Sequence, residues 1–283
     1  MMSSNTYKIF IYTALPCEAK PLIEHYKLKK DLTVHAFAVY LNNDICLVVS
    51  GLGKSAMAAA VAYSQARYIA IEHAVLVNIG TAGHRQYPLG ELFLIDKITD
   101  SDSKKSYYPA LITTAPCRRA SLQTVSKPQT EYHASELCDM EASAFYETAV
   151  RFTTNELILC LKVISDNQDS SIDAINAKQV TALIATQLSI IAALLIKVSE
   201  IAALITAPEP QLFYQLLEHY HFTAQQRQQL KSQLSRWDIL TDHQSLFILT
   251  DHQSLLLEDT NLVSGKDVLL WLDSRLNMIK FYL

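Results

Sequence analysis

Residues 74–84 read AVLVNIGTAGH, and this stretch decides the expected fold. Its first six residues form a continuous run that is apolar apart from Asn78, which is typical of a strand covered on both faces. The run leads into Gly80-Thr81-Ala82-Gly83, which predicts a loop where the backbone either turns or approaches a ligand. The sequence has only six glycines, and five of them lie between positions 51 and 90. Because glycine adopts conformations that other residues avoid, we expect the unusual backbone of this protein there.

Strands and helices are predicted to alternate on either side of this stretch. Apolar and β-branched runs predict strands at residues 7–14, 34–40, 45–50, 91–98 and 157–164. Helical spacing predicts helices at 18–26, 55–70, 140–151 and 173–205, the last of them long or broken. The polar residues 99–106 are expected to form a loop. This alternation predicts an α/β fold with a central, mostly parallel sheet.

A change of composition divides the chain near residue 206. Residues 206–210 read TAPEP, and the two prolines resist the continuation of a helix. We expect an α/β domain at residues 1–206 and a small, mainly helical extension at 207–283, whose role the sequence leaves open. Helices are predicted in the extension at 211–220, 223–236 and 264–276, the second of which begins with a capping box of Thr223 and Gln226.

The extension contains an internal duplication. The octapeptide ILTDHQSL occurs at residues 239–246 and again at 248–255. Two copies are too few for a solenoid, and we interpret them as a local duplication that forms a hairpin or paired loops. His243 and His252 could act together as metal ligands, but no third ligand accompanies them at a defined spacing, and we expect no metal site.

Composition and charge restrict which partners the protein is expected to bind and where in the cell it is expected to be. The 283 residues are 50% hydrophobic and 18% charged, which is typical of a globular protein. A net charge of −4 offers no positive field for nucleic acid or for an anionic membrane. Five dispersed cysteines without a C-x-x-C pair favour reduced thiols, and the N-terminal segment lacks the features of a secretion signal. We expect a cytoplasmic protein that binds neither nucleic acid nor membranes.

The most apolar segment, residues 182–205, has nearly the length of a membrane span. Lys197 and Glu200 interrupt it, and Gln187 and Ser189 lie inside it. These polar residues favour a buried helix over membrane insertion.

Four features with polar or glycine residues lie at the predicted ends of strands, where open α/β sheets bind ligands. They are Glu18, the Gly80–Gly83 loop, Asp139-Met140-Glu141 and Ser165-Asp166. Each of them alone is weak evidence, because a carboxylate at the start of a helix more often stabilises the helix dipole than catalyses a reaction. Together they predict one ligand site.

The motifs around these features resemble those of the nucleoside phosphorylase and nucleosidase family, which includes the methylthioadenosine/S-adenosylhomocysteine nucleosidases. The resemblance covers about residues 7–205 and rests on ALPCEA at 14–19, SGLGKSAMAAA at 50–60, VNIGTAGH at 77–84, LGELFLID at 89–96, CDMEASAF at 138–145 and LKVISDNQD at 161–169. It implies a three-layer, phosphorylase-like fold in which helices flank a twisted central sheet. It also implies cleavage of the N-glycosidic bond of a purine nucleoside or thionucleoside, and a homo-oligomer.

The resemblance also implies a role for each site residue. Asp166 matches the acid that protonates the purine N7, which requires a carboxyl group that holds a proton near neutral pH. Glu141 matches the carboxylate that accepts hydrogen bonds from the ribose 2′ and 3′ hydroxyls, and Met140 would contact the sugar and the base. Glu18 matches the base that activates water, with Thr81 contacting the nucleophile. The residues expected to complete the substrate site are Gly80, Gly83, Asp139 and Ser165.

The nucleophile is expected to be water, although phosphate remains the alternative. The strand before the glycine loop carries Asn78 where the hexameric phosphorylases have an arginine, and residues 15–20 replace their loop of glycine and arginine. Because phosphate needs converging positive groups, these differences favour a hydrolase that uses no cofactor. Cations that could still contact a phosphate co-substrate are Lys54, Arg85, Arg118 and Arg119.

The spacing between Thr81 and Glu141 leaves the nucleoside open. It is 60 positions, which is shorter than in the nucleosidases, where this segment supplies much of the base pocket. Tyr107, Tyr108 and residues 122–127 could supply part of that pocket. A third reading is a non-catalytic protein that binds a nucleoside and uses the extension as its partner surface.

Overall fold

The computed structural model describes residues 7–68, 70–110, 112, 114, 116–128, 136–171, 175–205, 210–240 and 262–278. Contacts divide the chain into two units, Met1–Thr206 and Ala207–Leu283, which we call the first and the second unit. Apart from residues 239 and 240, both ILTDHQSL copies, with His243 and His252, lie outside the described residues.

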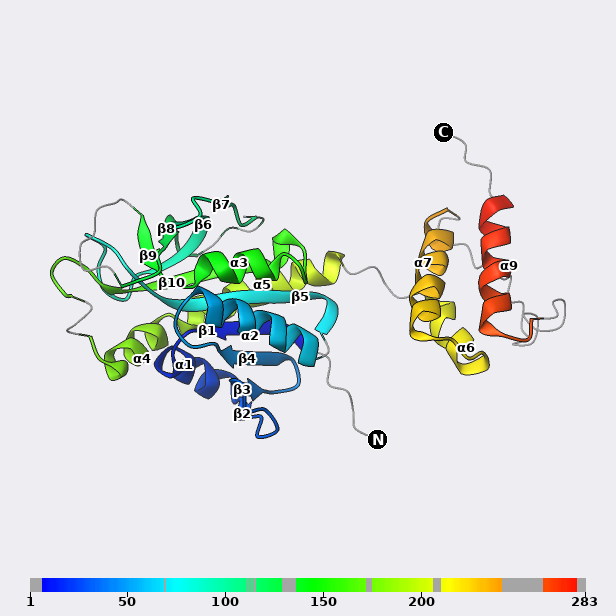
Figure 1. Cartoon of the computed structure of the whole chain (residues 1–283), viewed down its shortest axis with the longest axis horizontal. Helices are drawn as coiled ribbons and strands as arrows, with labels where there is room; N and C mark the ends of the chain where they lie inside the picture. Colours follow the sequence, from blue (N-terminus) through cyan, green and yellow to red (C-terminus); the bar gives the residue numbers. More distant parts are fainter. Residues whose placement is uncertain are drawn as a thin grey trace. The chain divides into compact units, whose positions relative to one another are not determined.

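One sheet forms the centre of the first unit (Figure 1). Along the chain its described strands are β1 (Tyr7–Thr13), β2 (Lys29–Lys30), β3 (Ala38–Leu41), β4 (Ile45–Val49), β5 (Ala70–Gly83), β6 (Leu92–Asp100), β7 (Ser106–Tyr107), β8 (Arg118–Thr124), β9 (Leu137–Asp139) and β10 (Ile158–Asp166).

The sheet is mixed: its longest pairings are parallel, as predicted, but shorter antiparallel pairings that the sequence did not predict accompany them. Parallel pairings join β1 to β4 and β5, β5 to β10, and β8 to β6 and β9. Antiparallel pairings join β3 to β2 and β4, β6 to β7 and β10, and β5 to β9. Short turns explain part of the difference, since a turn such as the one after β3, where Asn42 Oδ1 accepts hydrogen bonds from the amides of Asp44 and Ile45, can join only antiparallel strands.

Part of the sheet closes on itself. β10 pairs with both β5 and β6, while β8 and β9 connect β6 back to β5. The strands β5, β10, β6, β8 and β9 therefore form a small barrel-like ring. Four of the remaining strands continue from β5 as an open sheet in the order β1, β4, β3 and β2, and β7 pairs with β6.

Helices cover both faces of the sheet, which agrees with the predicted three layers. α2 (Lys54–Arg67) and α3 (Ala142–Ala149) pack on one face, and α1 (Pro16–Tyr26), α4 (Ala177–Thr186) and α5 (Leu188–Ile205) on the other. A short 3₁₀ helix, Asn155–Leu157, precedes β10. Side chains of β10 alternate between the two cores: Ile158, Cys160 and Ile164 join α2 and α3, whereas Leu159, Leu161 and Val163 join α1, α4 and α5.

Several predicted boundaries differ from the structure. The Gly80–Gly83 stretch is the end of β5 and not a loop, because the β5–β10 ladder continues to Gly83. Of the predicted loop 99–106, only residues 101–105 form the turn between β6 and β7, since Thr99, Asp100 and Ser106 belong to the strands; residues 34–37 lie outside the strands. The predicted long helix breaks at Gln187, whose side-chain amide donates a hydrogen bond to the carbonyl of Gly90.

Helix α5 is, by length and composition alone, apolar enough to cross a membrane. Its buried residues, Ile191, Leu194, Leu195, Val198 and Ala202, belong to the core of the first unit, and 28% of its residues are buried. Lys197 and Glu200 lie on its exposed side. One such helix is weak evidence for a membrane span, since a core helix has the same composition.

The second unit contains α6 (Gln211–His219), α7 (Ala224–Leu240) and α9 (Gly265–Met278). Its core includes Phe213, Leu216, Phe222, Leu230, Leu234 and Leu272. The predicted capping box is present: the Gln226 side chain accepts a hydrogen bond from the Thr223 amide, and Thr223 Oγ1 accepts one from the Gln226 amide. Both tryptophans of the sequence, Trp237 and Trp271, lie in helices of this unit.

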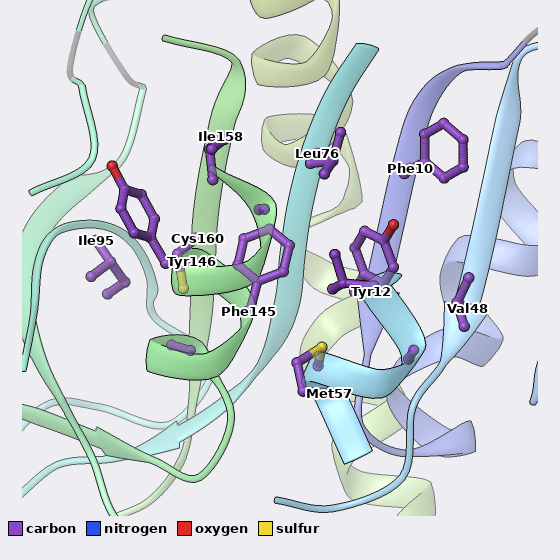
Figure 2. Packing of buried hydrophobic residues seen from close by; sticks show 14 of the residues in the cluster. Phe10, Tyr12, Val48, Met57, Leu76, Ile95, Phe145, Tyr146, Ile158 and Cys160 are labelled. Carbon is purple, nitrogen blue, oxygen red and sulfur yellow. The ribbon is translucent and has the colours of Figure 1, made fainter. Parts of the chain in front are cut away.

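Phe145 should carry much of the packing between α3 and the sheet. Figure 2 shows its ring near Tyr12 and Met57, and the ring centroids of Phe145 and Tyr12 are 5.6 Å apart. Phe145→Ala should lower the free energy of unfolding by about 3–5 kcal/mol because it leaves a cavity in a fully buried region. The measurement is chemical denaturation followed by far-UV circular dichroism.

The matched control is Phe152→Ala, since Phe152 follows the same helix but is 41% exposed. This variant should lose about 1 kcal/mol or less. Equal losses in the two variants would contradict the assignment of Phe145 to the core.

Candidate active site

A cavity of about 130 Å³ opens where β5, β9 and β10 end near the starts of α1 and α3. It brings together every residue predicted for the site except Gly80, which directly precedes Thr81 in β5. The lining residues are Ala14, Leu15, Glu18, Leu52, Thr81, Ala82, Gly83, Val125, Pro128, Cys138, Asp139, Met140, Glu141, Ser165 and Asp166. Four of them are acidic, and none is lysine, arginine or histidine.

Glu18 joins the first turn of α1 to the end of β5. It is the third residue of the helix, after Pro16, and its Oε2 accepts hydrogen bonds from the amides of Ala14 and Leu15 at 2.9 Å each. A glutamate at this position caps the free amides of a helix start. Its Oε1 accepts hydrogen bonds from the amide and the hydroxyl of Thr81, at 2.8 and 2.9 Å. Four donors thus hold this carboxylate in the cavity wall.

Lys162 is a site residue that the sequence analysis missed. It is only 1% exposed, and its Nζ lies 2.8 Å from Asp139 Oδ2. Burial alone would lower the pKa of this lysine, but the negative charge of Asp139 raises the pKa above its ordinary value, so the side chain stays charged. A signal was present in the sequence: Lys162 interrupts the apolar run LILCLKVI of a fully buried strand.

Gly80 leaves room for the Glu18 carboxylate beside Lys162. Gly80 and Lys162 lie opposite each other in the β5–β10 ladder. A Cβ at position 80 would lie 3.1 Å from Glu18 Oε1, which is tighter than most such contacts, and 3.4 Å from Lys162 Nζ, which is an ordinary van der Waals distance. Gly80 is therefore needed for space, and its conformation is that of an ordinary strand residue.

Asp139 is fully engaged by neighbours. Its Oδ1 accepts a hydrogen bond from Thr124 Oγ1 at 2.7 Å. Its Oδ2 accepts hydrogen bonds from the amides of Glu141 and Ala142, at 3.3 and 2.8 Å, besides the ion pair with Lys162. Asp139 therefore holds the start of α3, where Glu141 is the N-cap residue, as well as lining the cavity.

Glu141 differs from these two carboxylates because it retains acceptor capacity. Among the described residues its hydrogen-bond donor is the amide of Gly53, at 2.8 Å from Oε1. The side chain is 6% exposed. Burial raises the pKa of Glu141 to about 7, and the charge of Asp139 adds to this effect, while Lys162 and the Gly53 amide oppose it.

Asp166 ends β10 beside a rigid turn. Ser165 Oγ donates a hydrogen bond of 2.5 Å to Asp166 Oδ1, and the His84 amide donates one of 3.0 Å to the Asp166 carbonyl. His84 Nδ1 accepts hydrogen bonds from the amides of Gln86 and Tyr87, and its ring stacks on Tyr87 at 3.8 Å. The backbone that carries Asp166 is thus supported by the turn after β5.

The apolar part of the cavity wall contains no aromatic ring among the residues that the structure describes. Val125, Pro128, Cys138 and Met140 provide it, with Leu52 at 59% exposure. Tyr107 instead packs against Tyr146, and Tyr108 is exposed, so neither tyrosine is among the lining residues of the described cavity. Of residues 122–127, only Val125 is among the lining residues.

The cations considered for phosphate binding lie outside the cavity wall. Lys54 pairs with Asp100 and Asp102, at 2.9 and 2.6 Å. Arg118 pairs with Glu91 and lies over the ring of Tyr87, while Arg85 and Arg119 are exposed. Within the described ranges, no three His, Cys, Asp or Glu side chains are grouped so that they could hold a metal ion.

Comparisons with known proteins show the fold. No family model and no curated protein matches the sequence. A methylthioadenosine nucleosidase (MTAN) from Chlamydia trachomatis has 18% identity and a TM-score of 0.53, covering 67% of this chain and 100% of its own. An Arabidopsis thaliana 5′-methylthioadenosine nucleosidase has 16% identity and a TM-score of 0.52, covering 69% and 96%.

A third structure is the 5′-methylthioadenosine/S-adenosylhomocysteine nucleosidase from Neisseria meningitidis, in complex with methylthio-immucillin-A. It has 17% identity and a TM-score of 0.51, covering 65% of this chain and 97% of its own. The predicted resemblance to these nucleosidases is confirmed for the fold.

The raised pKa of Glu141 has a consequence for stability. A carboxyl group with a pKa of about 7 in the folded state and 4.5 when unfolded stabilises the fold below pH 4.5, and this contribution is lost as the pH rises through 7. Glu141→Gln removes the titration. The free energy of unfolding of the variant minus that of the parent should therefore rise by about 1–3 kcal/mol from about pH 5 to about pH 8.

The measurement is urea denaturation over this pH range. Glu147→Gln is the control, because hydrogen bonding to Lys105 lowers the pKa of the exposed Glu147, and the corresponding difference should not rise with pH. A flat difference for Glu141→Gln would contradict the raised pKa.

Proposed function

We propose that this cavity hydrolyses the N-glycosidic bond of a purine nucleoside or thionucleoside. The observation that carries the proposal is a wall built on the nucleosidase fold whose described lining residues include four carboxyl groups and no lysine, arginine or histidine. Cleavage of this bond develops positive charge on the ribose ring, and fixed negative groups around the ring stabilise that charge. Thionucleosides are included because the proteins of the similar structures are named for methylthioadenosine.

The hydrogen bonds support a division of labour among the carboxylates. A carboxylate offers about four lone-pair positions, and Glu18 and Asp139 each already meet four donors. Glu141 meets one donor among the described residues and can accept two more hydrogen bonds. We assign the ribose 2′ and 3′ hydroxyls to Glu141. Binding them favours its charged form and overcomes part of its raised pKa.

Glu18 is the proposed base for water. To accept the proton, it must exchange one of its four donors, and the Thr81 hydroxyl can do this by rotating, whereas the three amides are fixed. The oxygen of the rotated Thr81 hydroxyl can then contact the same water. Lys162 lies opposite Gly80 on the neighbouring strand, and its positive charge offsets part of the repulsion among the carboxylates of the cavity.

Asp166 is the proposed acid at the leaving base. In the proposed reaction the bond between C1′ and N9 breaks as water oxygen bonds to C1′. The water proton passes to Glu18, and Asp166 transfers its proton to N7, so that the purine leaves neutral. Ser165, which donates a hydrogen bond to Asp166 Oδ1, would hold the carboxyl group in position, and Met140 would contact the sugar and the base.

The position of the cations favours water over phosphate. A phosphate would enter a wall with four acidic residues, and Lys54 and Arg118 are already paired with carboxylates outside it. Electrostatic repulsion at close range in a buried site then disfavours the phosphate anion. Phosphorolysis therefore stays the second candidate. A non-catalytic nucleoside-binding protein is the third, with the second unit as its partner surface.

Other properties of the proposed enzyme follow from the sequence and stay predictions. They are a cytoplasmic location, a homo-oligomeric state, activity without a cofactor, and the absence of nucleic-acid and membrane partners.

The choice of nucleophile is tested by release of base with and without phosphate. The protein should release base from at least one of adenosine, inosine, guanosine, methylthioadenosine and S-adenosylhomocysteine in phosphate-free buffer, and phosphate should not increase the rate. Chromatography of the free base and of ribose or ribose 1-phosphate distinguishes the two reactions. Release that depends on phosphate would replace hydrolysis by phosphorolysis, and no release from any substrate would reject both.

The acid is tested by Asp166→Asn. Because an amide cannot supply the proton, kcat should fall by about 10²–10⁴-fold, while nucleoside binding measured by calorimetry persists. Asp96→Asn on β6 is the control, since Asp96 is not among the lining residues of the cavity. Full activity in Asp166→Asn would remove Asp166 from the proposed chemistry.

A further inference from the structure

Two turns meet at the side of the cavity assigned to the ribose. One follows β4 and contains Gly51 and Gly53, whose φ values of 87° and 94° lie in the region that favours glycine. The other is the Asp139–Glu141 turn before α3. The Gly53 amide donates a hydrogen bond of 2.8 Å to Glu141 Oε1 across the two turns. The orientation of Glu141 therefore depends on where the glycine turn is held.

A chain of polar contacts holds both turns from behind. Lys54, directly after Gly53, places its Nζ 2.9 Å from Asp100 Oδ2. The same Asp100 oxygen accepts a hydrogen bond of 2.7 Å from Ser143 Oγ. The Ser143 amide donates to Thr124 Oγ1 at 3.0 Å, and Thr124 Oγ1 donates to Asp139 Oδ1 at 2.7 Å. The chain ends at Lys162, which forms the ion pair with Asp139.

This chain connects α2, β6, α3, β8, β9 and β10, and its interior is shielded from water. Asp100, Thr124, Asp139, Ser143 and Lys162 are each no more than 6% exposed, whereas the Lys54 side chain is 24% exposed. Hydrogen bonds in such surroundings are stronger than in water, and a broken link leaves a buried polar group without its partner. Among these residues only Asp139 lines the cavity.

We propose that Lys54, Asp100, Ser143 and Thr124 are positioning residues that hold the Gly53 amide against Glu141, with Lys54 as the outer anchor of the chain. The part that concerns ribose recognition rests on the proposed nucleosidase function. Lys54 also pairs with the exposed Asp102 at 2.6 Å, so it contacts the carboxylate at the end of β6 and the one in the turn that follows. Loss of the Lys54 charge frees the glycine turn, and Glu141 loses its donor from Gly53.

The first arm of the test needs no activity. In Lys54→Met, the Gly53 amide should exchange with solvent at least about 10-fold faster, as measured by NMR or mass spectrometry. The pKa of Glu141, followed by carboxyl-carbon NMR, should rise, because the Gly53 amide lowers it in the parent. Lys105→Met is the matched control, since Lys105 forms an exposed pair with Glu147 outside the chain. Unchanged Gly53 exchange and an unchanged Glu141 pKa in folded Lys54→Met would overturn the proposal.

The second arm of the test measures how well the enzyme recognises the ribose hydroxyls. Lys54→Met should lower kcat/KM for the best ribonucleoside by about 10–100-fold, with a smaller loss for its 2′-deoxy analogue, because the 2′ hydroxyl is one of the groups bound by Glu141. Lys54→Arg should restore most of the activity. Equal losses on both substrates would show that Lys54 does not act through Glu141, and would overturn this part of the proposal.

A double variant distinguishes a folding defect of Lys54→Met from the effects that the two arms measure. If Lys54→Met does not fold, Lys54→Met/Asp100→Asn removes the uncompensated buried charge and takes its place in both arms. If the parent releases no base, the proposed function fails, while the exchange and pKa measurements still decide whether the chain positions Glu141.

Discussion

The buried ion pair of Lys162 and Asp139 is the interaction on which the site depends. Both side chains are almost fully buried, and removing one partner would leave a charge in the core at a cost of about 3–5 kcal/mol. The pair joins β10 to the start of α3. Gly80 lies opposite Lys162 in the ladder, and a Cβ there would be tight against Glu18 Oε1, at 3.1 Å. The position of β10 and the start of α3 therefore both depend on this buried ion pair.

The antiparallel strands that the sequence did not predict are part of what places this pair. β9 has three residues, yet it pairs with β5 through Gly83 and Cys138, and with β8 on its other side. These pairings close the ring of strands and bring Asp139 beside β10, although 23 positions separate Asp139 from Lys162 in the sequence. In this chain the closure includes the antiparallel pairings of β5 with β9 and of β6 with β10, so these pairings bear directly on the site.

The sequence predicts best where burial leaves a regular pattern. Apolar runs located β1, β4 and β10, and polar or glycine residues at strand ends located Glu18, Thr81, Glu141 and Asp166, which the structure brings to one cavity. Prediction failed where tertiary contacts decide. β8 contains arginines and serine, so its pairing leaves no apolar run. The Gly80–Gly83 stretch was taken for a loop because only the ladder with β10 makes it a strand. The chain from Lys54 to Asp139 joins residues far apart in sequence.

The positions of the two tryptophans assign a spectroscopic probe to one part of the chain. Trp237 and Trp271 lie in α7 and α9, and the sequence has no other tryptophan. Indole emission therefore reports the helices of the second unit directly, while the cavity and its strands are free of this fluorophore. A change in indole emission during denaturation therefore follows the unfolding of these helices and not that of the first unit.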